Sequence, residues 1–255
     1  MVQVGSIYIP TKSKLPKDIS NVRGKLARKA LAQLTIEDSQ DDELQDREEA
    51  AIEKPLSLNQ QRLEKVADTT LQGHNVKRVI DLCCGEGKLI KRLLQNKSIQ
   101  TITGVDVAHR ELGIASKRLK LDHLPFHQQD KVKLVQGSLI YRDKRFQDYD
   151  AATVIKVIEH LDLNRLAALA RVLFEFAQPK LVIVTTPNIK YNVRFKSLPV
   201  GKLRHRDRRF EWTRQEFQNW ANNVAERFNY QVNFEGISKL DAKVGTPTRM
   251  AILTK

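Results

Sequence analysis

The sequence predicts an α/β fold with a central, mostly parallel sheet that is flanked by helices. From about residue 56, short apolar runs typical of buried strands alternate with amphipathic stretches of helical period. A turn containing Gly85 and Gly87 joins the first of these strands to a helix. Strands that are separated by helices form parallel sheets with helices on both faces, so this alternation predicts the fold class.

The expected elements follow one another along residues 56–255. Helical periodicity places helices at residues 58–71, 86–95, 110–121, 163–177 and 213–228. Apolar and β-branched runs place strands at residues 77–82, 101–107, 132–138, 149–155, 180–187, 230–237 and 248–254. We expect the last two strands to be antiparallel. Thr213 and Glu216 have the spacing of a capping box, so the last helix is expected to begin there.

The chain divides by composition into three parts. Residues 1–36 form a basic arm, residues 37–55 an acidic linker, and residues 56–255 the folded domain. Within the linker, residues 37–53 hold nine acidic residues and Arg47 as the one base. Few of them are apolar, which is typical of a solvated segment. The remaining length is ample for one large domain with a buried core.

The charge of the chain favours an anionic partner. Its net charge is +14, and the acidic block makes the rest more basic still. Such an excess attracts nucleic acid through neutralisation of phosphates and release of counterions. The sequence shows no secretory leader and no apolar run of about 18 residues, so we expect a soluble, cytoplasmic protein with no membrane partner. Its two cysteines, Cys83 and Cys84, are adjacent, which excludes a zinc cage and fits a reducing compartment.

The first expected strand leads into a candidate nucleotide-binding turn. "VIDLCCGEGKLIKRLL" places a strand, the glycine turn and a helix in succession, and ligands of such sheets bind at the carboxyl ends of the strands. Asp106 ends the next strand, nineteen residues after Gly87, where it is placed to accept hydrogen bonds from both hydroxyls of a ribose. Dinucleotide-binding folds share this geometry, so the glycines alone do not identify the cofactor.

The fourth expected strand runs into a candidate chemical site. In "AATVIKVIEHLDLNRLA", residues 151–167, local helical turning would bring Lys156, Glu159 and His160 to one face. A carboxylate beside an imidazole suits a divalent cation, and it also suits general acid and base work on a hydroxyl. An isolated Glu-His pair is common on ordinary helices, so both readings stay open at this point.

Two later segments indicate contact with RNA. "TTPNIKYNVRF" offers Asn188, Tyr191 and Arg194 after the fifth expected strand, and aromatic and guanidinium groups together stack on a base and hold a phosphate. "KLRHRDRRFEWTR" gathers basic residues beside aromatic residues, and a run of charges that only meets solvent would not need the aromatic side chains. We expect this segment to hold RNA through Arg204, His205, Arg208 and Trp212.

Several stretches together resemble the small-RNA 3′-terminal ribose 2′-O-methyltransferases, and they fit the bacterial branch best. The resemblance covers about residues 56–253 and rests on "SLNQQRLEKV", "DLCCGEGKL", "QGSLIYRD", "VIEHLDLNRL", "TTPNIKYNVRF", "RHRDRRFEWTRQEF" and "VGTPTRMAI". It implies a class I methyltransferase (Rossmann-like) fold and S-adenosyl-L-methionine as cofactor. It also implies methylation of the 2′-hydroxyl at an RNA 3′ end, in RNA repair beside a kinase, phosphatase and ligase partner.

The resemblance also assigns cofactor residues. The family motif is an acidic residue followed by Gly-x-Gly-x-Gly, which falls on Asp81, Cys83, Gly85 and Gly87, with Cys83 in place of the first glycine. By the same resemblance, Ser138 would lie near the adenine.

The family's metal site is altered in this sequence. Relatives hold a divalent ion, Mg²⁺ or Mn²⁺, with a Glu-x-x-Glu-His motif and a later His. Glu159 and His160 match the second Glu and its neighbour, but Lys156 stands at the first Glu and Arg208 at the later His. A protonated lysine or arginine cannot coordinate a metal, so two of the four ligand positions are lost.

Three interpretations of the altered site remain. The ion binds weakly through Glu159 and His160, with His205 and substrate hydroxyls completing its shell. Alternatively, Lys156 and Arg208 supply the positive charge themselves, and Lys156 stabilises the 2′ alkoxide or acts as the base. In the third interpretation the protein is a catalytically inactive accessory that binds RNA ends in a repair complex. The hypothesis carried forward is an RNA methyltransferase with an altered metal site.

Overall fold

The computed structural model describes residues 57–72, 75–125, 130–199, 201–205 and 207–255. All of these residues belong to one compact unit, Glu49–Lys255. The basic arm, residues 1–36, and the acidic linker, residues 37–55, lie outside the described residues. None of the described helices is long and apolar enough to cross a membrane.

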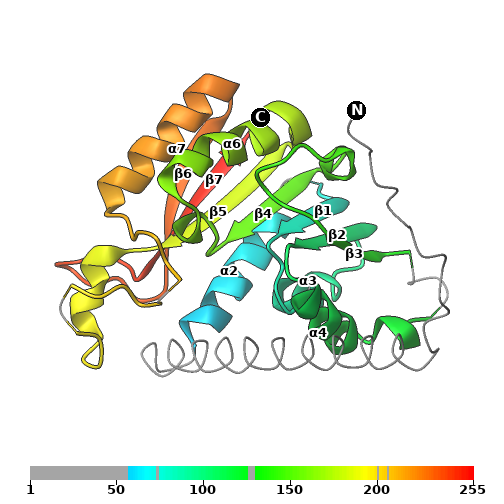
Figure 1. Ribbon diagram of the computed structural model, residues 1–255, viewed down its shortest axis with the longest axis horizontal. Helices are drawn as coiled ribbons and strands as arrows, with labels where there is room; N and C mark the ends of the chain where they lie inside the picture. The colour runs from blue at the N-terminus through cyan, green and yellow to red at the C-terminus, as the bar shows by residue number, and fades with distance from the viewer. Residues whose placement is uncertain (1–56, 73–74, 126–129, 200, 206) are drawn as a thin grey trace, which may run out of the picture. The chain divides into compact units, whose positions relative to one another are not determined.

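Within the described residues, seven strands form one sheet (Figure 1). They are β1 (Arg78–Leu82), β2 (Thr101–Asp106), β3 (Val132–Gln136), β4 (Ala151–Ile155), β5 (Leu181–Pro187), β6 (Gln231–Ile237) and β7 (Thr248–Thr254). Their order across the sheet is β3-β2-β1-β4-β5-β7-β6. The first five pair in parallel, and β7 runs antiparallel between β5 and β6. The predicted α/β class and the antiparallel last pair are confirmed.

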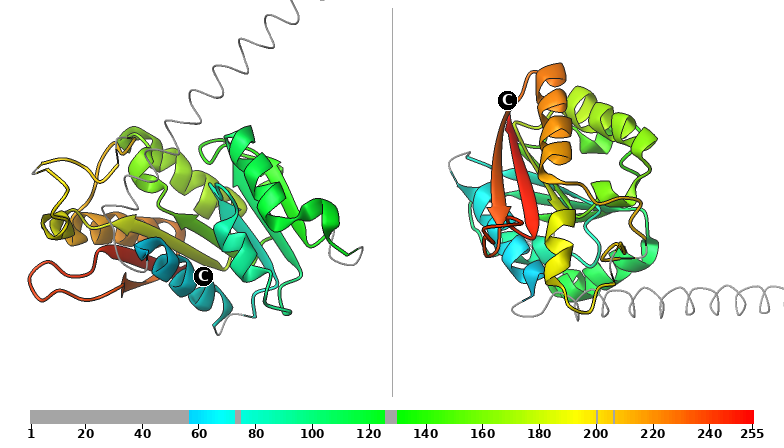
Figure 2. Two further views of the ribbon diagram at one scale, coloured as in Figure 1. Left: turned by 90° about the horizontal axis from the view of Figure 1, so that it is seen from below. Right: turned by 90° about the vertical axis from the view of Figure 1, so that its left-hand side faces the viewer.

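Helices cover both faces of this sheet (Figures 1 and 2). One layer consists of α2 (Leu58–Leu71), α3 (Lys88–Leu93) and α4 (His109–Leu119). The other consists of α6 (Leu166–Ala170), a π-helical segment, Arg171–Ala177, and α7 (Arg214–Phe228). The central strands are buried along nearly their whole length because both faces are covered.

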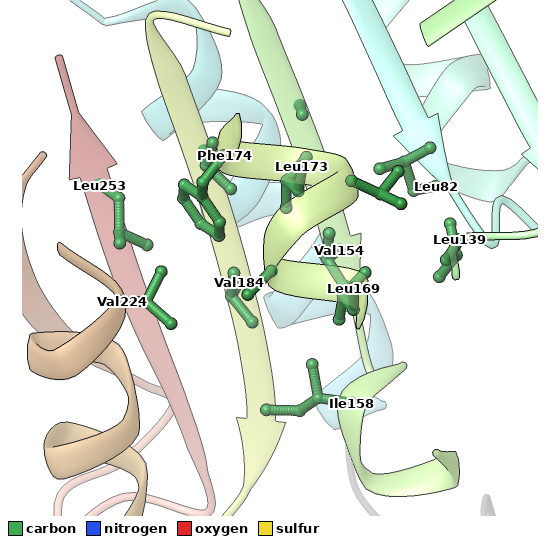
Figure 3. Packing of buried hydrophobic residues seen from close by; sticks show 14 of the residues in the cluster. Leu82, Leu139, Val154, Ile158, Leu169, Leu173, Phe174, Val184, Val224 and Leu253 are labelled. Atoms are coloured by element: carbon green, nitrogen blue, oxygen red, sulfur yellow. The ribbon is translucent and has the colours of Figure 1, made fainter. Parts of the chain in front are cut away.

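The second layer packs tightly on β4, β5 and β7. Val224 of α7 lies beside Leu253 of β7, while Leu173 and Phe174 point from the π-helical segment toward the sheet (Figure 3). Phe174 stacks on Phe228 at 5.9 Å between ring centroids and meets Tyr230 edge-on at 5.1 Å. These contacts fix the position of α7, and therefore of the segment that leads into it.

Two predicted helices show how well local signals work. The capping box is present, with the Thr213 side chain accepting from the backbone of Glu216 and the Glu216 side chain from that of Thr213. The predicted helix 163–177 is instead divided into a 3-10 turn, Leu163–Arg165, then α6 and the π-helical segment. Gln178 N–H donates to the carbonyl of Leu173, five residues earlier, and closes the wider turn.

The packing predicts the cost of truncating a core residue. Leu173 is 1% exposed, so we expect Leu173→Ala to lower the free energy of unfolding by about 2–5 kcal/mol, because it removes buried methyl groups and leaves a cavity. Leu163 is the control because it is 59% exposed, and Leu163→Ala should change the free energy of unfolding by about 0.5 kcal/mol or less. Urea unfolding followed by circular dichroism measures both. Similar losses in the two variants would contradict the packing described.

Candidate active site

The turn after β1 has the backbone that the glycine motif implies. Cys83, Gly85 and Gly87 all adopt left-handed conformations, with φ of 59°, 49° and 72°. A Cβ on Gly87 would lie 3.2 Å from atoms of both Ala115 and Leu119, so this glycine lets the turn approach α4. Cys83 takes the same kind of conformation with a side chain, at a cost on the order of 1–3 kcal/mol. The turn that the sequence predicts at this position is confirmed.

Asp106 ends β2 directly beside this turn. Its carboxylate accepts hydrogen bonds from Gly85 N–H and Ala108 N–H, each at 2.9 Å. An ionised carboxylate offers about four acceptor positions, so two remain for the hydroxyls of a ribose. A Cβ on Gly85 would meet nothing closer than Glu111 Oε2 at 4.0 Å, so the space beside the turn is open. These residues fit a nucleoside cofactor.

Asp81 lies in β1, two residues before Cys83 of the turn. It is 3% exposed, and Thr153 Oγ1 donates to its Oδ1 at 2.7 Å. Burial raises the pKa of Asp81 to about 7, while the Thr153 hydrogen bond opposes the shift and the charge of Asp106 adds to it. Ser138 lies in the loop after β3, where Gly137 N–H donates to the carbonyl of Asp106. Contact of Asp81 or Ser138 with the cofactor stays a prediction.

The chain turns sharply at Lys156. This residue has a left-handed backbone, φ 56°, and its N–H lies 3.2 Å from both the carbonyl and the Oγ1 of Thr185. A 3-10 helix, Ile158–His160, follows. The helical turning expected here therefore holds for Glu159 and His160 and does not extend back to Lys156.

Glu159 is fully buried, with none of its surface exposed. Thr186 Oγ1 donates to its Oε2 at 3.3 Å, whereas Oε1 accepts no hydrogen bond from the described residues. Burial raises the pKa of Glu159, and the positive charges of Arg208, Lys156 and Arg62 oppose that shift, in this order. The predicted direct contact of this carboxylate with a ribose does not fit its burial. The carboxylate lies instead where the charges of three cations act on it.

Arg208 belongs to a buried network of polar side chains. Its guanidinium is paired with the carboxylate of Glu211, and neither side chain has exposed surface. Glu211 also accepts from the backbone of Arg204 and from the side chain of Asn192. Arg204 in turn donates to Asn192 Oδ1 and to the carbonyls of Asn188 and Pro247, at 2.7, 2.8 and 3.1 Å. The network joins the segment after β5 to the segment before α7.

This burial corrects three of the predicted RNA contacts. Asn188, Arg204 and Arg208 are 0%, 3% and 4% exposed, so their side chains hold the two loops together rather than face a ligand. Asn188 Nδ2 donates to the carbonyls of Val244 and Thr246 at 2.8 and 2.9 Å. The prediction failed because a polar side chain that satisfies backbone carbonyls and one that binds RNA look alike in a sequence.

The other predicted residues keep accessible surface. The rings of His160 and His205 meet edge-on, with centroids 5.7 Å apart. Arg194 is exposed and pairs with Asp241 at 2.8 Å. Tyr191 and Trp212 are half-buried, and Trp212 packs on Phe210 at 4.6 Å between ring centroids. Their contact with RNA stays a prediction.

One residue of this site was missed in the sequence. Arg62 lies in the middle of α2, is 1% exposed, and donates to Thr248 Oγ1 at 3.2 Å and to Asn59 Oδ1 at 3.3 Å. A signal was available, because Arg62 is four residues after Leu58 and four before Val66, on the buried face of an amphipathic helix. An arginine in an apolar stripe indicates a buried partner.

The residues at this edge do not fit a divalent ion. No group of three His, Cys, Asp or Glu side chains in the described part of the chain is placed to hold a metal. The side chains that face Glu159 are cations, and cations repel a metal ion instead of coordinating it. The donors that remain, one buried carboxylate and two imidazoles, are fewer than the family's ligand set.

The comparisons with known proteins agree with this fold. Residues 47–232 match the family model described as "Methyltransferase domain". The small RNA 2′-O-methyltransferase of Mus musculus is 38% identical over 205 residues, which cover 78% of this chain and 51% of the mouse protein. The chain thus spans about half the length of that relative. The Arabidopsis thaliana relative is 33% identical, over 76% of this chain and 22% of its own length.

Solved structures define the family more narrowly. The fold is that of a class I, S-adenosylmethionine-dependent methyltransferase domain. A crystal structure of the methyltransferase domain of bacterial Hen1, CtHen1-CN, is 52% identical and has a TM-score of 0.71, and the match covers 78% of this chain and all of that one. The chain belongs to this family, the methyltransferase domains of the small RNA 2′-O-methyltransferases.

The raised pKa of Asp81 predicts a pH dependence of stability. Between the unfolded pKa of about 3.9 and the folded pKa of about 7, the folded state keeps a proton that the unfolded state has lost. The stabilisation is therefore complete below the unfolded pKa and is lost as the pH rises through about 7, by on the order of a few kcal/mol. We expect Asp81→Asn to remove this slope in urea unfolding between pH 4 and 8. Asp122→Asn is the control, because Asp122 is exposed, and it should keep the wild-type slope. An unchanged slope in Asp81→Asn would contradict the raised pKa of Asp81.

Proposed function

We propose that this protein transfers a methyl group from S-adenosylmethionine to the 2′-hydroxyl of the 3′-terminal ribose of RNA, and that it does so without a bound divalent ion. The observation that carries the second part is the set of cations around Glu159. Lys156 and Arg208 occupy the two substituted ligand positions, and Arg62 approaches the same carboxylate. These cations support the proposal that side-chain charge takes over the role of the metal in the family.

The residues of the site have different proposed roles, which follow from how exposed they are. Asp106 and the glycine turn hold the nucleoside part of the cofactor, which supplies an electrophilic methyl group when bound. His160, at the surface end of the 3-10 helix, would accept the proton of the 2′-hydroxyl as that oxygen takes up the methyl group. Lys156 stabilises the negative charge that develops on the 2′ oxygen.

Glu159 acts below the surface as a positioning residue. Its buried carboxylate attracts Lys156 and Arg208, and its carbonyl accepts from the backbone N–H of Arg209 at 2.8 Å. Because Arg208 is also held by Glu211, its charge stays buried, and Lys156 is the partly exposed cation of this group. This arrangement supports Lys156 as the group that replaces the metal at the ribose.

A metal-independent mechanism predicts insensitivity to chelators. With a short 3′-hydroxyl RNA, we expect EDTA to change the rate of methyl transfer less than twofold, and added Mn²⁺ not to increase it. A 2′-deoxy end should accept no methyl group. Loss of activity in EDTA that Mn²⁺ restores would contradict the proposal.

Lys156→Met tests the role of the cation. Removal of one group that stabilises a developing oxyanion costs about 10²–10³ in kcat, so we expect a loss of this size with little change in cofactor affinity. Lys180→Met is the control, because its side chain is 80% exposed and lies at the opposite end of the sheet, beside Asp150. Equal rates in Lys156→Met and in the wild type would remove Lys156 from the mechanism.

A second candidate function is that of an RNA-end-binding accessory protein without catalysis. The burial of Glu159 favours it, since a predicted catalytic carboxylate is out of reach of a substrate. Calorimetric binding of S-adenosylmethionine separates the two functions, because an accessory protein has no need of the cofactor. One chain of the Pnkp1/Rnl/Hen1 RNA repair complex shares the fold at 20% identity, TM-score 0.59, so association with such repair enzymes stays a prediction from the family resemblance.

A further inference from the structure

A pocket opens between α7 and the β6–β7 hairpin, beside the site described above. Its lining includes Arg214, Phe217, Gln218, Phe234, Thr246 and Arg249. Its volume is about 100 Å³, whereas one ordered water needs roughly 10–15 Å³ of such space. The elements that form it lie side by side at the β6 edge of the sheet (Figures 1 and 2). The pocket therefore has room for a group several times larger than water.

Arg249 is the unusual member of this lining. It is only 8% exposed, and its Nε is buried without a hydrogen-bond partner. In the described part of the chain, its guanidinium makes no hydrogen bond or ion pair. Burial and the nearby charge of Arg214 lower the pKa of Arg249 to about 10, so it remains charged at neutral pH. Its Nε–H is thus an unsatisfied donor beside the pocket, and a guanidinium with unused donors suits an anion that enters the pocket.

The backbone of Gly245 lies beside the guanidinium. Gly245 has a left-handed conformation, φ 82°, and a Cβ there would lie 3.6 Å from Arg249 Nη2. Glu235 also borders the pocket, but it pairs with Lys65 of α2 at 2.7 Å. Since Arg249 is in register with Gly236, the side chain of Glu235 points to the opposite face of the sheet. Among the described residues that line the pocket, no carboxylate therefore points to the face of Arg249.

The pocket is close to the candidate active site. Arg249 is paired in register with Thr186 on the adjacent strand β5, and Thr186 Oγ1 donates to Glu159. Neighbouring strands are about 4.8 Å apart, so the backbone of Arg249 is adjacent to that of Thr186, which contacts Glu159. The pocket and the candidate active site are thus joined through one pair of neighbouring strands.

We infer that Arg249, assisted by Arg214, binds one backbone phosphate close to the 3′ end of the RNA. The inference rests on the proposed function for its substrate, and it adds a subsite that positions the strand. A guanidinium presents paired N–H donors that match two phosphate oxygens. Gln218 offers an amide donor, and the rings of Phe217 and Phe234, 6.2 Å apart, form the apolar walls.

Arg249→Gln tests this subsite by RNA binding without cofactor. We expect the dissociation constant of a 5′-labelled RNA to rise roughly tenfold or more by fluorescence anisotropy, since hydrogen bonds to charged groups are strong. The slope of log K against log salt should fall by about one. Arg227→Gln is the control, because Arg227 is exposed on the same helix α7. Wild-type affinity in Arg249→Gln would overturn the inference.

Neutral linkages identify the phosphate. Single methylphosphonates are placed at the last, second and third linkages from the 3′ end. One of them should weaken wild-type binding by the same factor as Arg249→Gln and should cost the variant nothing further, as in a double-mutant cycle. The inference is wrong if, at each of the three linkages, the loss of affinity caused by the methylphosphonate multiplies with the loss caused by Arg249→Gln. If affinity is lost at one linkage only, but no RNA accepts a methyl group, the proposed function is wrong and the phosphate subsite still stands.

Protein stability distinguishes a ligand site from a structural arginine. Replacing an uncompensated buried charge by a neutral amide should leave Tm unchanged or raise it. Inorganic phosphate should raise the Tm of the wild type and not that of Arg249→Gln. A lower Tm of the variant, or equal effects of phosphate on both proteins, would assign Arg249 to the fold and contradict the subsite.

Discussion

The constraint on which this site depends is one buried carboxylate, Glu159, on which the charges of three cations act. Glu159 has no exposed surface, and isolated in the interior it would not remain charged. Arg62 comes from α2, Lys156 from the end of β4, and Arg208 from the segment before α7. Elements that are far apart in the sequence are thereby drawn to one edge of the sheet. The second carboxylate, Glu211, extends the same network to Arg204 and the loop after β5.

This network explains why the substitutions occur in the same site. A lysine in place of one metal ligand would leave a lone cation beside a dication, which is strongly unfavourable. In the proposed mechanism the charge of Lys156 takes the place of the ion at the ribose, while Arg208 is paired with Glu211. The cofactor side of the site is built from different residues, Asp106 and the glycine turn, so it keeps the geometry of the fold. An altered chemical site and a conventional cofactor site are therefore compatible.

The sequence was sufficient for most of the fold. Apolar periodicity located the strands and the capped helix α7, because burial on both faces leaves a clear pattern. It failed where side-chain contacts at long sequence separation decide the outcome. Arg62 meets Thr248 across 186 residues, and Arg204 satisfies backbone carbonyls rather than RNA. The wider helical turns after α6 were likewise not predicted, because no local pattern in the sequence distinguishes them from an α-helix.

Direct titration with Mn²⁺ tests the central claim that side-chain cations replace the ion. The ligand-free wild type and the double variant Lys156→Glu, Arg208→His are compared by calorimetry and by the electron paramagnetic resonance of free Mn²⁺. The charge network predicts no saturable Mn²⁺ binding to the wild type and the appearance of one site in the double variant. Stoichiometric binding of Mn²⁺ to the wild type, lost in Glu159→Gln, would contradict it.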